Sequence, residues 1–340
     1  MRIMILLVMS FASIAAFADS RIDNYYGADF IAGHQNKTLK NDDLKNLLFS
    51  ILSGGHVKQD QQPDEIVSNC EVDAVLASSD ATRAAAYSDI PTAEAMPISP
   101  SSVSINPSLQ SVTEPGSADI TPDATSKKCV QHTALGYNGA RRKLFGQLFL
   151  KQDAAGIYNV KDVYCEKEFT DADFKGETTF GPDMLPISGN IINTEHTWPQ
   201  SRFTGRFPRE LQKSDLHHLF PTDSQMNGQR GSLHFGYVVD PQKPSPLKCP
   251  QNKFGRQENG EIIFEVPDTQ KGNTARAIFY FATRYQMKMS PAEEAALRKW
   301  DKFDPVDAQE ADQNSQIEDL QGNRNPYIDY SDLVDSIDHF

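Results

Sequence analysis

Residues 193–201 read NTEHTWPQS, and they end a strand-like run, ISGNIINT, on a carboxylate beside an imidazole. A surface hairpin does not need this pair, but a hydrolytic site does. Adjacent residues of a strand face opposite ways, so Glu195 and His196 would approach one reaction centre from different sides. Four of the eight histidines fall between His196 and His234, which draws attention to the same region.

The residues after this motif predict a strand, a loop, a second strand and a helix. An irregular loop covers residues 197–213, DLHHLF is the second strand, and Pro221 closes it. Thr222 or Asp223 then caps a short helix, SQMNGQRG. Asn227 and Arg230 are three residues apart, so both project from one face of that helix.

These residue types suit the hydrolysis of a phosphodiester, which needs an activated water and positive charge near the phosphorus. A neutral His196 can accept the proton of water because imidazole titrates near neutrality. The backbone carbonyl of the facing strand, near Lys213, can fix the tautomer of His196. Magnesium prefers oxygen ligands and keeps several of its own waters, so one carboxylate and one amide are enough protein ligation. Glu195 and Asn227 supply that pair.

Six short stretches follow one another along the chain: EHTWPQS, DLHHLFPTD, NGQRG, NTARAIFYFATRY, DPVD and GNRNPYIDY. In this order they resemble the endonuclease I family of secreted bacterial nucleases, whose core is a ββα-metal (His-Me) finger. The resemblance covers about residues 24–56 and 132–336. It implies that His196 is the general base and that Glu195 and Asn227 bind a divalent metal ion. The ion would be Mg²⁺, with Mn²⁺ or Ca²⁺ as substitutes.

The resemblance also implies a monomer that cleaves DNA, and possibly RNA, without sequence preference and leaves 5′-phosphate ends. In that family a phosphate-contacting arginine lies in the loop between the two strands, where Arg206 and Arg209 are both candidates. Arg230 is a further basic group near the metal. Asp215 and His217 are predicted either to support the metal ligands or to satisfy buried backbone groups, with equal weight.

Several other side chains are assigned a structural role. His218 and Trp198 are expected to pack in the core, and Arg276 and Arg284 to serve helix packing or salt bridges. For the remaining histidines in the chain, the sequence identifies no partner: His34, His56, His132 and His339.

The N-terminus predicts export. Residues 3–17 are almost wholly apolar, and Ala16-Phe17-Ala18 forms a cleavage site before Asp19, so residues 1–18 are interpreted as a signal peptide. We expect a mature protein in the periplasm or outside the cell, with no membrane segment. An even number of cysteines in an oxidising compartment favours two disulfides, and three pairings are open.

Composition divides the rest of the chain. Residues 57–131 are acidic and of low complexity, and they are predicted to be a disordered insertion. Cys70 and Cys129 lie near its ends, so we expect the pairs Cys70–Cys129 and Cys165–Cys249. Residues 19–56 and 132–340 form the predicted nuclease domain, an α+β fold of mixed helices and short strands around the finger.

The net charge of −13 does not exclude a nucleic-acid partner. Residues 58–128 and 301–340 carry more than all of the excess acid, and the remainder, which holds the motif, is mildly basic. We expect the acidic tail, residues 301–340, to be a solvated surface. Its ADQNSQ stretch replaces a more basic one seen in many relatives.

Two other functional classes fit parts of the sequence. One is a catalytically inactive protein of the same fold that only binds nucleic acid. The other is a secreted zinc hydrolase with His196, His217 and His218 as ligands. Adjacent His217 and His218 on a strand cannot easily both point at one ion, and no CxxC pair is present.

Overall fold

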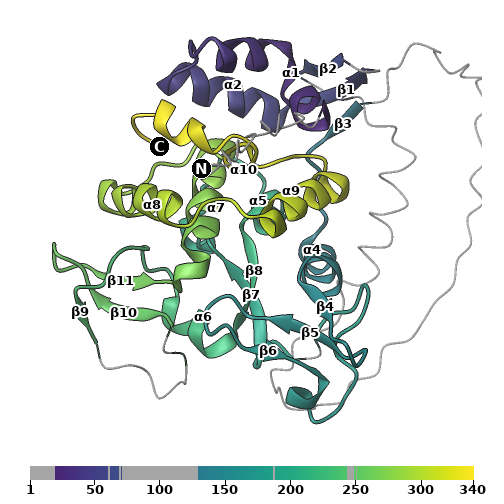
Figure 1. The fold of residues 1–340 in the computed structure, drawn as a ribbon, viewed down its shortest axis with the longest axis vertical. Helices are drawn as coiled ribbons and strands as arrows, with labels where there is room; N and C mark the ends of the chain where they lie inside the picture. The colour runs from purple at the N-terminus through teal and green to yellow at the C-terminus, as the bar shows by residue number, and fades with distance from the viewer. Residues whose placement is uncertain are drawn as a thin grey trace, which may run out of the picture. The chain divides into compact units, whose positions relative to one another are not determined.

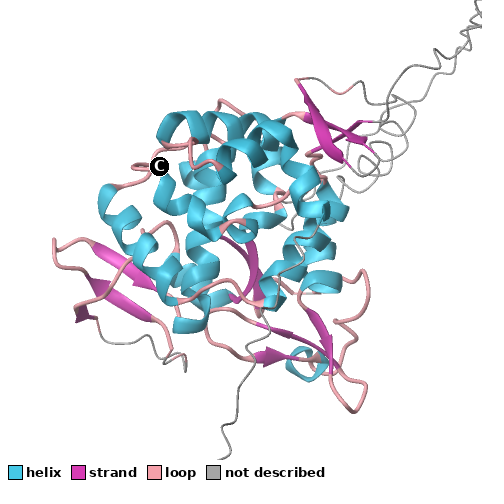
Figure 2. Cartoon of the chain, turned by 45° about the horizontal axis from the view of Figure 1, so that its top comes forward, coloured by secondary structure: helices cyan, strands magenta, loops and turns pink. Residues whose placement is uncertain are grey.

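The computed structural model describes residues 20–59, 62–68, 70, 129–186, 188–242, 249 and 251–340. The predicted signal peptide and residues 71–128 of the predicted insertion lie outside this part of the chain. The described residues form the α+β fold that the sequence predicts. Figure 2 shows helices at the centre, flanked by short strands.

The helices in chain order are α1 (Ser20–Gln35), α2 (Asn41–Ser53), α4 (Tyr137–Lys143), α5 (Arg209–Lys213), α6 (Ser224–Arg230), α7 (Lys271–Arg284), α8 (Pro291–Phe303), α9 (Ala308–Gln321) and α10 (Pro326–Asp329). The strands are β1 (Gly55–Gln59), β2 (Gln62–Val67), β3 (Cys129–Gln131), β4 (Leu150–Gln152), β5 (Tyr158–Lys161), β6 (Glu168–Phe169), β7 (Ile192–His196), β8 (Leu219–Asp223), β9 (Asp240–Pro241), β10 (Lys253–Arg256) and β11 (Ile262–Glu265). No helix in the described part of the chain is long and apolar enough to span a membrane.

The β7–β8 pair and α6 together form the predicted strand–loop–strand–helix unit (Figure 1). The two strands are antiparallel, with Glu195 opposite Phe220 and His196 opposite Leu219. The Asp223 side chain caps α6 by accepting hydrogen bonds from the next backbone N–H groups. The unit therefore brings the end of β7 close to the helix that carries Asn227.

The second strand begins later than the sequence predicts. Leu216–His218 forms one turn of 3₁₀ helix, and β8 starts at Leu219. The Asp215 carboxylate caps this turn by accepting a hydrogen bond from the His217 N–H. A side chain that bonds to its own neighbouring backbone competes with strand pairing, which explains the later start.

Helix α7 is the centre of the larger hydrophobic core. It contacts α2, α8, α10 and the 3₁₀ turn before β8. Its sequence predicts one apolar face, but every residue of the helix except Asn273 is buried. Trp198 packs against it by stacking on Phe281 at 5.4 Å, as its expected core role requires.

Residues at both ends of the predicted insertion are folded, which corrects its expected boundaries. Strand β1 pairs with β2 on one edge and with β3 on the other, so residues 57–59, 62–67 and 129–131 are strand instead of disordered chain. The expected disulfides are both present, Cys70–Cys129 and Cys165–Cys249. The first joins β3 to the residues just after β2, so it closes the base of the insertion.

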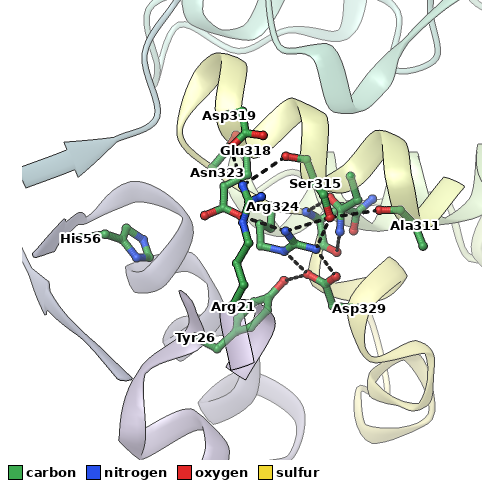
Figure 3. Close-up of polar contacts among 12 residues, drawn as sticks. Arg21, Tyr26, His56, Ala311, Ser315, Glu318, Asp319, Asn323, Arg324 and Asp329 are labelled. Atoms are coloured by element: carbon green, nitrogen blue, oxygen red, sulfur yellow. Dashed lines mark hydrogen bonds and ion pairs between the residues drawn. The ribbon is translucent and has the colours of Figure 1, made fainter. Parts of the chain in front are cut away.

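Part of the acidic tail is buried, which corrects the prediction from its composition that the whole tail is a solvated surface. Arg324 is fully buried and pairs with Glu318 at 2.8 Å and with Asp329 at 2.7 Å. Figure 3 shows these groups converging on Arg324, with Arg21 and Tyr26 of α1 beside them. Glu318 and Asp329 can lie inside the fold because each has a cationic or hydroxyl partner.

Candidate active site

Glu195 lies near the end of β7 and is only 1% exposed. Its Oε1 accepts two hydrogen bonds, from the Tyr164 hydroxyl at 2.9 Å and from Arg230 Nη1 at 2.7 Å. Burial raises the pKa of the Glu195 carboxyl, while the Arg230 charge and the Tyr164 hydrogen bond oppose that rise. Oε2 receives no hydrogen bond from the described residues, so one carboxylate oxygen stays available to a ligand.

His196 is held in one tautomer. Its Nε2 lies 3.1 Å from the backbone oxygen of Lys213, and a carbonyl can only accept, so Nε2 carries the hydrogen. This confirms the expected partner, although Lys213 ends helix α5 and is not in a strand. Burial, followed by the nearby His218 ring, lowers the pKa of His196 to about 3. The imidazole is therefore neutral at physiological pH, with its lone pair on Nδ1.

Gln200 and Arg209 extend the arrangement from His196 toward solvent. Gln200 Nε2 lies 3.4 Å from His196 Nδ1, and Arg209 Nη2 donates to Gln200 Oε1 at 3.1 Å. Arg209 is exposed and has no ion pair within the described residues. Of the two loop arginines, it is the one that the structure links to His196.

Arg206 points elsewhere. It lines a cavity of about 520 Å³ together with side chains of α2 and of the C-terminal end of α7, Lys45 and Thr283 among them. No hydrogen bond among the described residues connects it with Glu195, His196 or Asn227. Arg206 is therefore a weaker candidate than Arg209 for contact with a reacting phosphate.

The amide of Asn227 is oriented by its own hydrogen bonds. Nδ2 donates to Asn193 Oδ1 at 2.7 Å and to the Thr194 backbone oxygen at 3.1 Å. Both amide hydrogens are thereby used, and Oδ1 accepts no hydrogen bond from the described part of the chain. One free carboxylate oxygen and one free amide oxygen, on β7 and the adjoining α6, are a donor set that fits a hard divalent cation.

Arg230 is buried, and its two terminal nitrogens donate to residues at the end of β7 and directly after it. Besides Glu195, it donates to the backbone oxygens of His196 at 3.0 Å and Thr197 at 2.6 Å. Only 1% of the residue is exposed, which leaves it no path to a substrate phosphate. Its contacts position the Glu195 carboxylate, which does not match the predicted catalytic role in contacting a phosphate.

Asp215 and His217 lie in a separate polar network of the core. Asp215 accepts hydrogen bonds from the Tyr280 and Tyr285 hydroxyls at 2.8 Å each, and His217 Nε2 bonds to the Asn323 backbone oxygen. Neither has a hydrogen bond or ion pair to Glu195, His196 or Asn227 within the described residues. Of the two predicted roles, these contacts match the structural one.

The described residues hold no group of three or more histidine, cysteine, aspartate or glutamate side chains that could hold a metal ion. His217 and His218 each turn Nε2 toward a backbone oxygen, that of Asn323 and that of Gln212. The geometry thus offers no support for the zinc arrangement of His196, His217 and His218.

Two functional neighbours were missed from the sequence. Tyr164 is 31 residues before Glu195, and Tyr137 places its ring 5.5 Å from that of His196. Neither belongs to a local motif with the residue that it contacts. The one available signal was for Tyr164, which precedes a half-cystine and would be held rigidly by the Cys165–Cys249 bridge.

Comparison with known proteins agrees with this geometry. The sequence profile of endonuclease I matches residues 126–332. The chain belongs to the endonuclease I family. That stretch contains β7, β8 and α6, with Glu195, His196 and Asn227.

Three relatives illustrate the range of this similarity. The chain is 34% identical over 164 residues to an extracellular ribonuclease of Bacillus amyloliquefaciens, covering 43% of this chain and 53% of the relative. It is 26% identical over 125 residues to an extracellular deoxyribonuclease of Aeromonas hydrophila, covering 34% and 49%. It is 30% identical over 116 residues to Endonuclease-1 of Buchnera aphidicola, covering 34% and 44%. The chain thus spans about half the length of the relatives that it matches.

Proposed function

We propose that this chain is an exported endonuclease that hydrolyses the phosphodiester bonds of DNA, and also of RNA, without sequence preference. The observation that carries the proposal is the neutral His196, held in one tautomer and next in sequence to Glu195, together with the carboxylate oxygen of Glu195 and the amide oxygen of Asn227 that accept no hydrogen bond from the described residues. Membership of the endonuclease I family supports it. So do relatives that are named as extracellular nucleases for each of the two substrates.

In the proposed reaction His196 Nδ1 takes a proton from a water molecule, whose oxygen attacks the phosphorus. The bond between phosphorus and the 3′ oxygen breaks, and the 3′ oxygen takes a proton from solvent water, which gives a 5′-phosphate and a 3′-hydroxyl. The Lys213 backbone oxygen keeps the other imidazole hydrogen in place, and stabilises the imidazolium as it forms.

Glu195 and Asn227 would hold a single divalent cation, Mg²⁺ by the nature of the two oxygen donors. When bound, the ion supplies positive charge against the extra negative charge of the transition state and the leaving oxygen. Arg230 and Tyr164 keep Glu195 in position. Arg209, exposed and without an acidic partner, is the side chain that would bind the phosphate.

Export is part of the proposal. Residues 1–18 have the pattern of a signal peptide, two disulfides suit an oxidising compartment, and the relatives are named as extracellular or periplasmic nucleases. The mature protein would act in the periplasm or outside the cell, as a monomer.

The test is digestion of supercoiled plasmid by the purified mature protein in Mg²⁺ and in EDTA, with His196→Ala alongside. We expect nicking in Mg²⁺ that EDTA abolishes and that falls by about 10²-fold or more in the variant. Folded wild type that retains DNA without cutting it would replace the nuclease by the inactive binding protein.

A further inference from the structure

A group of cations around His196 has no acidic partner. Within the described residues, Arg141, Arg209 and Lys213 form no ion pair. Three arginines that are at most 1% exposed are paired with acids: Arg230 with Glu195, Arg276 with Asp301 and Glu310, and Arg324 with Glu318 and Asp329. In a chain of net charge −13, a group of cations without an acidic partner is suited to binding an anionic ligand.

Two of these cations are organised by one aromatic ring. Lys213 Nζ lies 4.2 Å from the centroid of the Tyr137 ring, and the Arg141 guanidinium carbon lies 5.7 Å from it. Tyr137 and Arg141 are four residues apart on α4, so both project from the same face of that helix. A cation over an aromatic face is attracted to it, so the ring restrains two long side chains that would otherwise be mobile. We call Tyr137, Arg141 and Lys213 the Tyr137 clamp.

One acid that contacts the clamp already accepts a hydrogen bond from its backbone. Glu210 is on α5, the helix that ends at Lys213, and its Oε1 accepts a hydrogen bond from the Tyr137 backbone N–H at 2.6 Å. This contact ties the start of α4 to α5 and uses the carboxylate on a backbone group. Glu210 therefore positions the clamp without neutralising its cations.

The clamp is attached to the general base at two points. The backbone oxygen of Lys213 accepts the His196 hydrogen, and the Tyr137 ring is 5.5 Å from the His196 ring. Successive phosphates of one nucleic-acid strand are about 3.4 Å apart along a helix axis. Cations this close to the base would meet a strand within one or two phosphates of the bond that is cut.

We infer that the Tyr137 clamp is a binding subsite for the backbone phosphate next to the scissile one, with Lys213 and Arg141 as its cations. The inference rests on the proposed function and extends it, because it assigns a second phosphate contact separate from that of Arg209. The same residue, Lys213, then orients the base through its main chain and binds the substrate through its side chain.

The salt dependence of binding tests this subsite. Affinity for a fluorescein-labelled single-stranded oligodeoxynucleotide is measured in EDTA between 50 and 200 mM salt. Each phosphate contact that is lost lowers the slope of log Kd against log salt by about 0.7. We expect a fall of about 0.7 for Lys213→Met and about 1.4 for Lys213→Met with Arg141→Met, with roughly a tenfold rise in Kd for the double variant at 150 mM salt. Lys299→Met, at an exposed position on α8, should keep the wild-type slope.

Two further comparisons separate a phosphate contact from a general loss of structure. Tyr137→Phe keeps the ring and should keep the slope, whereas Tyr137→Leu should lower it. An oligonucleotide in which every second backbone phosphate is a neutral methylphosphonate should bind more weakly to wild type, and the loss should be smaller for the double variant. An equal loss of affinity from the methylphosphonate in wild type and in the double variant would overturn the subsite. So would an unchanged salt slope in Lys213→Met. Wild type that neither binds nor cuts the oligonucleotide would instead overturn the proposed nuclease.

Discussion

At Glu195, two donors meet the same carboxylate oxygen. Tyr164 and Arg230 both donate to Oε1, and Oε2 is left for a ligand. The same division occurs at Asn227, where the amide nitrogen is used by the protein and the oxygen is not. The surrounding hydrogen bonds thus fix the free oxygen of each side chain in advance, which would reduce the ordering cost of binding the proposed metal ion.

Tyr164→Phe tests this arrangement by removing one hydroxyl. We expect the Mg²⁺ concentration for half-maximal DNA cleavage to rise by about tenfold, since outer partners of metal ligands commonly contribute that much. The matched control is Tyr158→Phe on β5, where the half-buried hydroxyl has no hydrogen bond within the described residues. An unchanged Mg²⁺ dependence in Tyr164→Phe would show that Arg230 alone positions Glu195.

The catalytic dipeptide was predictable from the sequence, but its support was not. The acceptor for His196 near Lys213 could be anticipated because a general base needs a fixed tautomer. Tyr164 and Tyr137 could not, because each is identified only by the fold that brings it to the site. Arg230 was predicted as a basic group near the metal, and the structure shows that it is buried and donates to Glu195.

Elements with a periodic apolar pattern and a cap are the ones that a sequence predicts best. Helix α2 carries its buried leucines at helical spacing, and Ser290 caps α8 by accepting from the Glu293 N–H. Helix α9 was assigned to the surface because its sequence, AQEADQNSQIEDLQ, has no apolar stripe. It is buried through polar pairs such as Glu310 with Arg276, 34 residues away. No local pattern reports a pairing over that distance.

The burial of α9 makes a quantitative prediction. Arg276 is 0% exposed and donates to both Asp301 and Glu310, so Arg276→Met leaves two buried carboxylates without their cation. We expect a loss of about 3–5 kcal/mol in the free energy of unfolding by urea. Lys302→Met breaks the exposed pair with Asp335 and should cost less than about 1 kcal/mol. Similar losses in the two variants would show that the Arg276 ion pairs are not what stabilises α9.

The sheet at the base of the insertion depends on a glycine. A Cβ on Gly55 would overlap the Sγ atoms of both Cys70 and Cys129, so the disulfide packs directly on strand β1. Gly55→Ala should destabilise the protein by about 1–3 kcal/mol through overpacking. It should also speed the reaction of this disulfide with a mild reductant, followed by thiol titration.

Gly139→Ala in α4 is the matched control for Gly55→Ala. There the added Cβ meets only Leu135 Cβ, at an ordinary 3.6 Å, and alanine favours a helix. We expect this variant to be as stable as wild type or more so. Equal behaviour of the two alanine variants would contradict the packing of the disulfide on Gly55.

Across the whole described unit, the two ends of the chain are joined by polar contacts. Tyr26 donates to Asp329 and Asn41 to Asp338, which ties α1 and the start of α2 to the acidic tail. These two acids are therefore engaged by partners within the protein. The clamp cations and Arg209 are not, which resolves how an acidic chain can present a basic site.

Buried histidines make the stability of the whole unit depend on pH. Burial lowers the pKa of His132 to about 3, because Asp215 only partly offsets it and Arg284 and His217 add to it. Burial likewise lowers the pKa of His218 to about 4. In the unfolded chain both imidazoles return to about 6.5. Between these values the unfolded state binds more protons than the native state, so stability is fully present above about pH 6.5 and falls as the pH is lowered toward 4.

We expect the free energy of unfolding to fall by about 1.4 kcal/mol per pH unit for each of these imidazoles well below pH 6.5. Urea titrations from pH 7 to 5 measure the slope. His132→Gln keeps an acceptor for Arg284, whose Nε donates to His132 Nδ1 at 3.3 Å, but cannot take up a proton. Its slope should be shallower than that of wild type by the contribution of one histidine. His339→Gln, near the C-terminus, should leave the slope as it is. If His132→Gln kept the wild-type slope, His132 would already be protonated in the folded protein, as a charged partner of Asp215 at 3.9 Å.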